Sequence, residues 1–262
     1  MDPERRRALA DRNEVAAYDL IARHAPAGAG GRREFGRAVA IASGHPVGYF
    51  NPVFVLDAAT AAEDVLAAVA WIESAGLPPT VRVHDGADAH VAARLEARGL
   101  ELDPEPETVM VLESIPKAPT PPDGPRIRTG GTELIEDWHE AFEANERLRA
   151  ILNPDVVADP DVRIAVLDVD GDPVAGAMAF RWDESVGIYT VATVERARRR
   201  GYGRAVTWAA IDAGRAAWGS RIAVLQSSAM GGSVYAAMGF EAIGSIGLWR
   251  ARLRPPSGAA AE

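Results

Sequence analysis

The chain has no cysteine among its 262 residues. This absence excludes disulfide bonds, thiolate metal sites and a cysteine nucleophile. The chain also lacks any run approaching the roughly 20 apolar residues that a membrane-spanning helix needs. Its N-terminal residues 1–7 are polar and lead into a mixed helical pattern, so no signal peptide is predicted. We therefore expect a cytoplasmic protein without a membrane partner.

The chain also has no excess of positively charged residues. The formal net charge is -9 and the pI is about 5.2, which disfavours general binding to nucleic acids or anionic membranes. Hydrophobic residues make up 48% and charged residues 25% of the chain, an ordinary globular balance that argues against disorder. The length suits one large domain or two of about 130 residues each.

Prolines mark the predicted domain boundary within the chain. Five of them fall within the eleven residues 115–125, where they cannot continue a helix or a sheet and instead favour an extended linker. We therefore predict a first domain over 1–115, a linker over 116–125, a second domain over 126–254 and a disordered tail over 255–262.

Hydrophobic periodicity predicts helices and strands in both halves. In the first half we expect helices over 4–24, 60–74 and 87–98, and strands over 37–43, 48–57, 81–83 and 108–112. Thr60-Ala-Ala-Glu63 matches a capping box at the start of the second helix. In the second half we expect helices over 132–149, 202–217 and 232–238, and strands over 126–128, 162–169, 173–182, 186–194, 222–225 and 241–253. Asp170-Gly171-Asp172 is a hairpin turn signal between two of these strands.

The two halves align when one is shifted by about 140 residues. Arg98-Gly-Leu-Glu101 then falls on Met238-Gly-Phe-Glu241, each at a helix end before a strand, and the helix from 60 falls on the helix from 202. This pattern indicates a duplicated domain. The segment 58–63 falls on 198–203 but has no glycine and no arginine, so the copies differ in this loop.

The loop Arg198-Arg-Arg-Gly-Tyr-Gly203 fits the pattern Arg-x-x-Gly-x-Gly. It lies between a β-branched strand pattern and the start of a helix, where backbone N–H groups have no partner inside the helix. Such a junction favours anions, and arginines beside it add charge-assisted hydrogen bonds. Glycine allows the backbone to approach phosphate oxygens closely. The sequence therefore predicts a diphosphate site, with a basic surface loop as the alternative.

The order of strand, basic loop, helix and strand, followed by Tyr235-Ala-Ala-Met-Gly-Phe240, resembles the GNAT family of acetyl-CoA-dependent N-acetyltransferases in its tandem form. The resemblance implies an α/β fold of two tandem GNAT-like domains, each with a central mixed, mostly antiparallel β-sheet flanked by helices. It implies a degenerate first copy and a second copy that binds acetyl-CoA as co-substrate. By position, the coenzyme would contact Val191, Ala192, Thr193, Arg198, Arg199, Arg200, Gly201, Tyr202, Gly203, Arg204 and Ser228.

Tyr235 is the catalytic residue that the resemblance implies, protonating the departing thiolate. A phenol with a pKa of about 10 is well matched to a thiolate with a pKa of about 8.5. The first copy has Leu95 at the matching position. Relatives often have an asparagine seven residues before this tyrosine; this chain has Ser228 there, and a serine hydroxyl can still form a hydrogen bond with the coenzyme arm.

The general base is not assigned by the sequence. Relatives that use a glutamate carry it in the strand before the loop, where this chain has Thr190. A water chain would suffice, and the candidates each also suit an exposed or capping position: His139, Asp183, Glu184 and Glu195. His24, His45, His84 and His90 show no metal-binding spacing, so no metal is expected.

Two hypotheses follow for the activity. In the first, the protein is an N-acetyltransferase that moves an acetyl group from acetyl-CoA to a primary amine by direct attack in a ternary complex. In the alternative, it is a non-catalytic acyl-CoA-binding module with a regulatory or structural role. The partners expected are a coenzyme A thioester and an amine acceptor, and a homodimer is left open.

Overall fold

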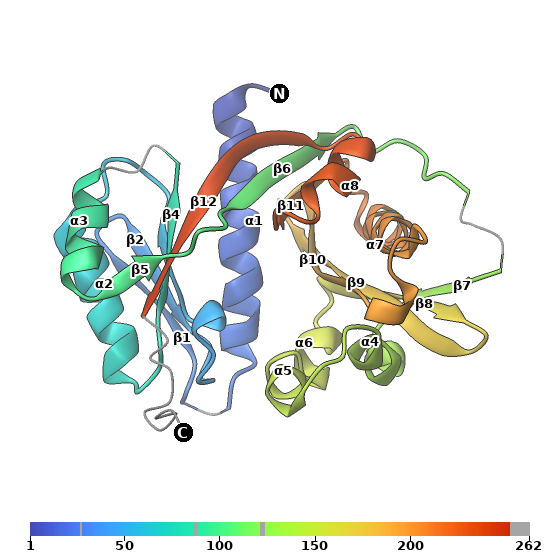
Figure 1. Ribbon diagram of the computed structural model, residues 1–262, viewed down its shortest axis with the longest axis horizontal. Helices are drawn as coiled ribbons and strands as arrows, with labels where there is room; N and C mark the ends of the chain where they lie inside the picture. The colour runs from blue at the N-terminus through green and yellow to red at the C-terminus, as the bar shows by residue number, and fades with distance from the viewer. Residues whose placement is uncertain (27, 86–88, 121–123, 252–262) are drawn as a thin grey trace, which may run out of the picture.

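The computed structural model describes residues 1–26, 28–85, 89–120 and 124–251 (Figure 1). The predicted disordered tail over 255–262 lies outside the described residues, as does part of the predicted linker, 121–123.

The described strands form one continuous sheet of twelve strands. Their order is β1-β2-β3-β4-β12-β6-β11-β10-β9-β8-β7, with β5 paired to β12. The strands are β1 (Gly31–Phe35), β2 (Ala38–Ala42), β3 (Pro52–Val55), β4 (Thr80–His84), β5 (Leu100–Leu102), β6 (Glu107–Glu113), β7 (Arg126–Gly130), β8 (Val162–Val169), β9 (Asp172–Trp182), β10 (Ser185–Thr193), β11 (Ile222–Ser227) and β12 (Glu241–Ala251).

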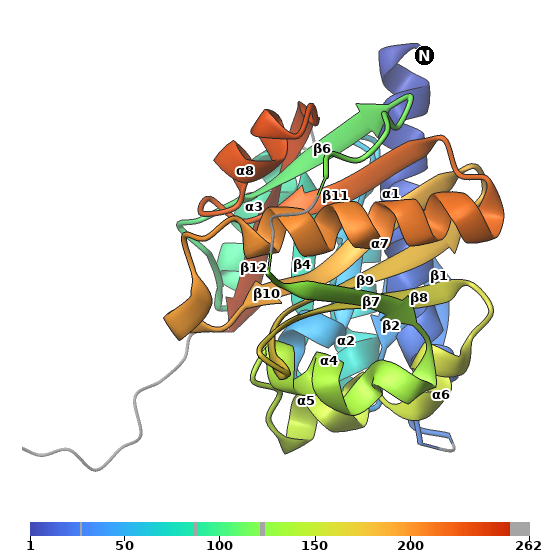
Figure 2. The ribbon, with the colours of Figure 1, turned by 90° about the vertical axis from the view of Figure 1, so that its right-hand side faces the viewer.

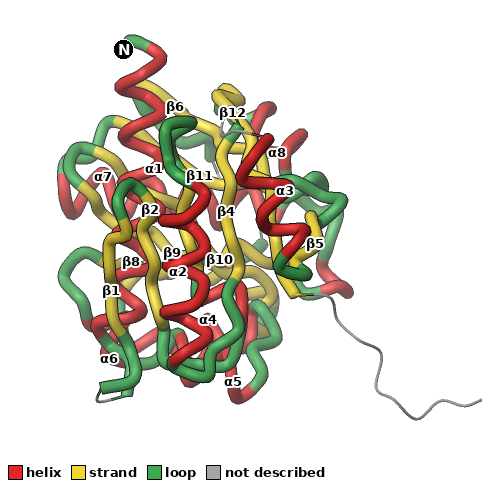
Figure 3. The backbone as a smooth tube through the Cα atoms, turned by 90° about the vertical axis from the view of Figure 1, so that its left-hand side faces the viewer, coloured by secondary structure: helices red, strands yellow, loops and turns green. Residues whose placement is uncertain are grey.

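Helices cover both faces of this sheet (Figures 2 and 3). They are α1 (Pro3–Arg23), α2 (Ala62–Ser74), α3 (Ala89–Ala97), α4 (Ile135–Ala141), α5 (Glu146–Ile151), α6 (Pro154–Ala158), α7 (Tyr202–Trp218) and α8 (Gly232–Ala237), with 3₁₀ turns η1 (Gly48–Phe50), η2 (Thr132–Leu134) and η3 (Glu195–Ala197).

Each half contains one parallel strand pair joined by a helix, and the other pairings are antiparallel. β3 lies parallel to β4 with α2 between them in sequence, and β10 lies parallel to β11 with α7 between them. Gly99 and Gly239 take equivalent places before β5 and β12, both with positive φ (86° and 96°). These matches follow the predicted repeat, and the predicted mixed, mostly antiparallel sheet flanked by helices is confirmed.

The two halves exchange their last strands. β6 leaves the first half and pairs with β11 over six residues, 108–113 against 222–227. β12 leaves the second half and pairs with β4 and β5, and the two exchanged strands lie beside each other. The sheet is therefore continuous between the residues before and after the proline-rich segment. Each half contributes a strand whose backbone forms hydrogen bonds with strands of the other half. The domain limits 1–115 and 126–254 stay a prediction.

Alternation along β8 divides the second half into two cores, as expected for a strand covered on both faces. Ala165 and Leu167 face the core under α7. Ile164 and Val166 face the core beneath α4, where Trp138 is fully buried. Residues of α1 join this second core, including Leu20. The side of the sheet opposite α7 is thus shared between α1 and α4–α6.

Helix α1 lies where the halves meet (Figure 1). It packs on β10, β9 and β11 of the second half and on β1, β2 and β6 of the first. Its buried residues include polar ones, among them Asp11, Asn13 and Glu14, each at most 6% exposed. A helix that buries charged side chains has to supply them with partners inside the protein.

The structure differs from the local predictions at several places. The predicted strand 48–57 begins with the 3₁₀ turn η1, and only Pro52–Val55 form β3. Thr60 does not cap α2, because the helix starts after Ala61 and has no side-chain cap. The strand β1 was not predicted, since its sequence Gly-Arg-Arg-Glu-Phe is polar and it lies at the sheet edge. The predicted helix 132–149 is divided into η2, α4 and α5, because Glu143 takes a positive φ of 54° and Asn145 starts α5 by accepting a bond from the Leu148 amide. Among the described residues, no helix has the length and apolar character to cross a membrane.

Candidate active site

Strands β10 and β11 separate after a short parallel contact. Their pairing covers only 185–187 against 222–224, although the strands continue to Thr193 and Ser227. On its other side β10 carries a bulge between Tyr189 and Ala192, where Thr190 adopts a positive φ of 49°. A bulge bends its strand and increases its twist. The β10 edge that faces β11 is consequently left open over its second half.

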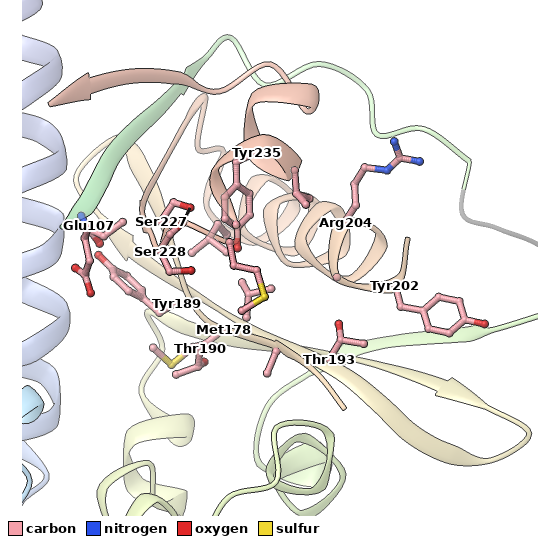
Figure 4. A pocket seen from close by; sticks show the side chains of 18 of the residues that line it. Glu107, Met178, Tyr189, Thr190, Thr193, Tyr202, Arg204, Ser227, Ser228 and Tyr235 are labelled. Atoms are coloured by element: carbon pink, nitrogen blue, oxygen red, sulfur yellow. Dashed lines mark hydrogen bonds between the residues drawn. The ribbon is translucent and has the colours of Figure 1, made fainter. Parts of the chain in front are cut away.

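A cavity of about 760 Å³ opens between the separated strands. Such a volume is within the range of small-molecule sites. Figure 4 shows the two ends of the cavity. Glu107 and Tyr189 lie at the end next to α1, and Tyr202 and Arg204 lie at the far end. Tyr235, Ser227 and Ser228 lie between these ends.

The N-terminus of α7 forms the far end. Gly201 precedes the helix with a left-handed backbone, φ 80°, and no side chain caps the helix. The preceding Arg199 is also left-handed, φ 62°, so the chain turns sharply before the helix starts. The Arg198 guanidinium donates to the Thr193 carbonyl at 3.1 Å. Uncapped N–H groups of a 17-residue helix, with arginines beside them, make a favourable place for an anion.

Gly203 is in the wall of this end. A Cβ atom placed on it would be 3.3 Å from the Thr193 hydroxyl oxygen, a tight contact in which that side chain would have to shift. Gly201 has no atom within 4 Å of such a Cβ, so there the positive φ, and not space, requires glycine.

The structure brings nearly all the predicted site residues to one cavity. They line it from β10 (Val191, Ala192, Thr193), from the loop and helix start (Arg198, Arg199, Gly201, Tyr202, Gly203, Arg204) and from the segment after β11 and α8 (Ser228, Tyr235). Arg200 is exposed and does not line it. The binding role of these residues stays a prediction.

Tyr235 lies in the short helix α8, with its ring 5.9 Å from that of Phe240 in an edge-on contact. Burial raises the pKa of the Tyr235 phenol, while a hydrogen bond to Thr207 lowers it to a smaller extent. The phenol is therefore protonated at neutral pH and can donate a hydrogen bond or a proton. Leu95, its counterpart in the repeat, is fully buried in the first-half core.

None of the four base candidates lines the cavity. His139 is 3% exposed and its Nε2 bonds the Leu152 carbonyl at 2.9 Å, and burial lowers its pKa. Glu184 pairs with Arg5 at 2.5 Å, Asp183 occupies the turn between β9 and β10, and Glu195 begins η3. In the described part of the chain, no group of three or more histidines and carboxylates is arranged to hold a metal ion.

Carboxylates reach the cavity from the first half, which sequence reasoning missed. Glu14 comes from α1 and Glu107 from β6, and both line the cavity together with Tyr18 and Tyr49. A signal for α1 was present: Asp11, Glu14 and Tyr18 are spaced by three and four residues, so they share one helix face with apolar neighbours. Buried charge on an otherwise apolar face is unusual and points to a function or a paired site.

Arg82 of β4 is the shared ion-pair partner of the two carboxylates at this end of the cavity. It is fully buried and pairs with both Glu14 and Glu107. The rings of Tyr18 and Tyr49 lie 5.5 and 5.4 Å from its guanidinium carbon. Burial alone would lower the pKa of Arg82, but the carboxylates keep it above its usual value. Burial raises the pKa of Glu14, an effect that Arg82 only partly offsets.

Comparison with known protein families gives a match over the part of the chain that contains the loop 198–203. Residues 131–240 match the acetyltransferase (GNAT) family. No curated protein matches the chain. Solved structures resemble the chain at low sequence identity, so this similarity is evidence for the fold alone.

A GCN5-related N-acetyltransferase from Kribbella flavida is similar over 95% of this chain and 96% of its own, with a TM-score of 0.69 and 20% identity. A tandem GNAT protein from the clavulanic acid biosynthesis pathway is similar over 94% and 97%, with a TM-score of 0.56 and 16% identity. A GCN5-related N-acetyltransferase from Sphaerobacter thermophilus is similar over 83% and 81%, with a TM-score of 0.56 and 21% identity. The segment 131–240 thus matches the acetyltransferase (GNAT) family, and the chain as a whole has the fold of tandem GNAT proteins.

Proposed function

We propose that the protein transfers an acetyl group from acetyl-CoA to a primary amine by direct attack in a ternary complex. The observation that carries the proposal is the opening between β10 and β11 onto the uncapped start of α7. It offers an extended backbone edge, an anion site at one end and a buried phenol between the ends.

The coenzyme would lie along this opening. Its diphosphate would accept bonds from the first amides of α7 and from Arg198, Arg199 and Arg204, because a helix start with adjacent guanidinium groups favours phosphate oxygens. Its pantetheine arm would follow the free edge of β10 near Val191 and Ala192, which have no partner on β11.

The chemistry requires one bond to form and one to break. The neutral amine nitrogen, after its ammonium proton has passed to solvent, attacks the thioester carbonyl carbon. The resulting tetrahedral intermediate collapses with loss of the carbon–sulfur bond, and the nitrogen releases a second proton. Tyr235 would give its phenol proton to the sulfur and regain one from solvent. The phenol suits this role because its burial keeps it protonated.

Release of the coenzyme A thiol is the test. Since the chain has no cysteine, a thiol reagent reports only the product, without background from the protein. With acetyl-CoA and a panel of amines, we expect amine-dependent thiol release and an acetylated amine detected by mass. The rate should depend on both substrates in the manner of a ternary complex. Coenzyme binding without transfer to any amine would favour the non-catalytic acyl-CoA-binding alternative.

Gly203→Ala separates coenzyme binding from folding. The added methyl would press on Thr193 in the cavity wall, so the affinity for acetyl-CoA should fall about tenfold, equivalent to ~1.4 kcal/mol. The free energy of unfolding should change by less than about 1 kcal/mol, the scale of helix propensities. Calorimetric titration and thermal unfolding measure the two effects.

Gly219→Ala is the matched control, at the other end of α7. There φ is 70° and the space is open, so a left-handed alanine should cost about 1 kcal/mol of stability without changing coenzyme affinity. Equal affinities in the two variants would contradict the placement of the coenzyme at the helix start.

A further inference from the structure

We infer that the α1 end of the cavity is the acceptor subsite, and that it takes a primary amine with a single positive charge and a flat apolar body. An arylalkylamine is the simplest such molecule. The inference rests on the proposed function, and it assigns the recognition of the acceptor to residues of the first half.

The cavity has opposite charges at its two ends. Of the described residues that line it, the basic ones are Arg198, Arg199 and Arg204 at the loop, and the acidic ones are Glu14 of α1 and Glu107 of β6. Figure 4 shows Arg204 and Glu107 at opposite ends. An anionic coenzyme and a cationic acceptor would each meet the complementary end. The two ligands would then be aligned with their reacting groups in the middle of the cavity.

Carboxylates outnumber guanidinium groups around the acidic end, although one of the carboxylates, Asp85, is partly solvated with 46% of its side chain exposed. Among the described groups, Arg82 and Arg7 face four carboxylates, Glu14, Glu107, Asp11 and Asp85. His84, which is 1% exposed, lies among them: its Nδ1 is 2.5 Å from Arg7 and 3.1 Å from Asp11, and its Nε2 is 3.9 Å from Glu14. Even with His84 protonated, the carboxylates outnumber the cations. An uncompensated negative charge in a buried site favours a cation. A bound ammonium would reduce this imbalance.

One oxygen of Glu14 accepts no hydrogen bond from the described residues. Glu14 is 1% exposed, and its Oε1 pairs with Arg82. Its Oε2 is buried without a hydrogen bond, and His84 Nε2 lies 3.9 Å from it. Glu107 is more accessible, with 14% of its side chain exposed, and the Tyr49 hydroxyl donates to its Oε1 at 3.0 Å. A buried carboxylate oxygen that lacks a donor is costly, and an ammonium group has three donors to give.

The remaining walls of this end are apolar and aromatic. All five tyrosines of the chain line the cavity, and Tyr18, Tyr49 and Tyr189 lie at this end with Phe50. Tyr49 is 40% exposed, which leaves ring surface free for a ligand. The Tyr189 hydroxyl donates to Asn13 Oδ1 at 2.6 Å, which fixes its ring as a wall. Further apolar lining comes from Ala17, Ile21, Leu152 and Met178.

This lining limits the class of amine. A polyamine or an aminoglycoside carries several separated charges, whereas the two acidic residues here gather at one point around Arg82. A polyhydroxylated acceptor would need many hydrogen-bond partners along its length, and the walls around Tyr49 and Leu152 are mostly carbon. One ammonium at the carboxylates and a flat apolar body against the rings match the site.

Binding of three probes to the full chain tests the inference without requiring turnover. With saturating coenzyme A present, 2-phenylethylamine, 2-phenylethanol and spermidine are titrated and followed by calorimetry. We expect 2-phenylethylamine to bind at least about tenfold more tightly than the neutral alcohol, from one charge-assisted bond, and more tightly than spermidine. Equal affinity of the amine and the alcohol, or tighter binding of spermidine, would overturn the inference.

Glu107→Gln should remove the preference for the amine over the alcohol, because the amide keeps the shape but loses the charge and one of the two oxygens that accept from Tyr49 and Arg82. Glu96→Gln, an exposed site on α3, is the control and should keep the preference. If Glu107→Gln is unstable, Tyr49→Leu serves instead and should weaken both aromatic ligands together. Unchanged affinities in either cavity variant would contradict the subsite. Amine binding without thiol release would disprove the proposed transfer and leave the subsite intact.

Discussion

Arg82→Met should lower the free energy of unfolding by about 3 to 5 kcal/mol at neutral pH, the range seen when one partner of a buried ion pair is removed. Arg82 is fully buried and is the shared partner of Glu14 and Glu107. Without it, Glu14, itself 1% exposed, would keep a charge with no guanidinium to offset its desolvation. Denaturant unfolding monitored by circular dichroism measures the loss.

The pH dependence of this loss gives a second signature. In the variant, burial and the nearby charge of Glu107 raise the pKa of Glu14 in the folded state further above the unfolded value of about 4.3, because the offsetting charge of Arg82 is gone. A raised folded-state pKa favours folding at low pH and disfavours it as the pH rises through the folded-state pKa. The difference between variant and wild type should thus be largest near pH 7 and shrink towards pH 4.

Arg37→Met provides the matched control for an exposed pair. Arg37 pairs with Asp57, and its side chain is 61% exposed, so its loss should cost no more than about 1 kcal/mol. If the two variants lose equal stability, or if the loss at Arg82 does not depend on pH, the buried carboxylate cluster is not what Arg82 compensates.

Tyr235→Phe should lower turnover by about 10²- to 10⁴-fold, the usual contribution of a positioned general acid, while leaving acetyl-CoA affinity nearly unchanged. The ring and its contact with Phe240 remain in the variant, so only the proton donor is lost. Because burial raises the pKa of this phenol, the wild-type protein should retain its proposed acid through neutral and mildly alkaline pH. Steady-state thiol release and calorimetric titration separate the two effects.

Ser233→Ala on the same short helix is the control, since Ser233 is exposed and does not line the cavity. It should leave turnover within a few-fold of wild type. A Tyr235→Phe enzyme with full turnover would remove the phenol from the reaction, and one with lost coenzyme affinity would make Tyr235 a binding residue.

Much of the second half could be predicted from its sequence because the signals are local. The strand, the glycine loop and the helix from Tyr202 follow each other within about 30 residues, and backbone requirements at Gly201 leave a visible mark in the sequence. The hairpin at Asp170-Gly171 is another example: both residues have positive φ, 54° and 86°, as this turn type requires.

The exchanged strands could not be predicted in the same way. The patterns of β6 and β12 indicate strands, but a period-two pattern does not specify which strand is the neighbour. The pairing of β6 with β11 joins residues more than 100 positions apart. Only the assembled sheet shows that each half completes the other.

The acidic end of the cavity was missed for a related reason. Glu14 and Glu107 belong to separate elements and meet only around Arg82, a third residue whose strand was predicted but whose burial was not. His139 was considered as a base because of its residue type, whereas its burial and its bond to Leu152 give it a structural role. The residue type suggests a possible chemical role, but the contacts of the side chain in the folded protein decide whether it can perform that role.

A calorimetric titration of the full chain with acetyl-CoA tests the central claim most directly, that one coenzyme site lies where β10 meets α7. We expect saturable binding with one acetyl-CoA per chain, because the first-half counterpart of the loop, 58–63, has neither glycine nor arginine. Arg199→Glu, which reverses a charge at the helix start, should abolish or greatly weaken that binding. No binding at millimolar acetyl-CoA, two equal sites per chain, or unchanged affinity in Arg199→Glu would contradict the claim.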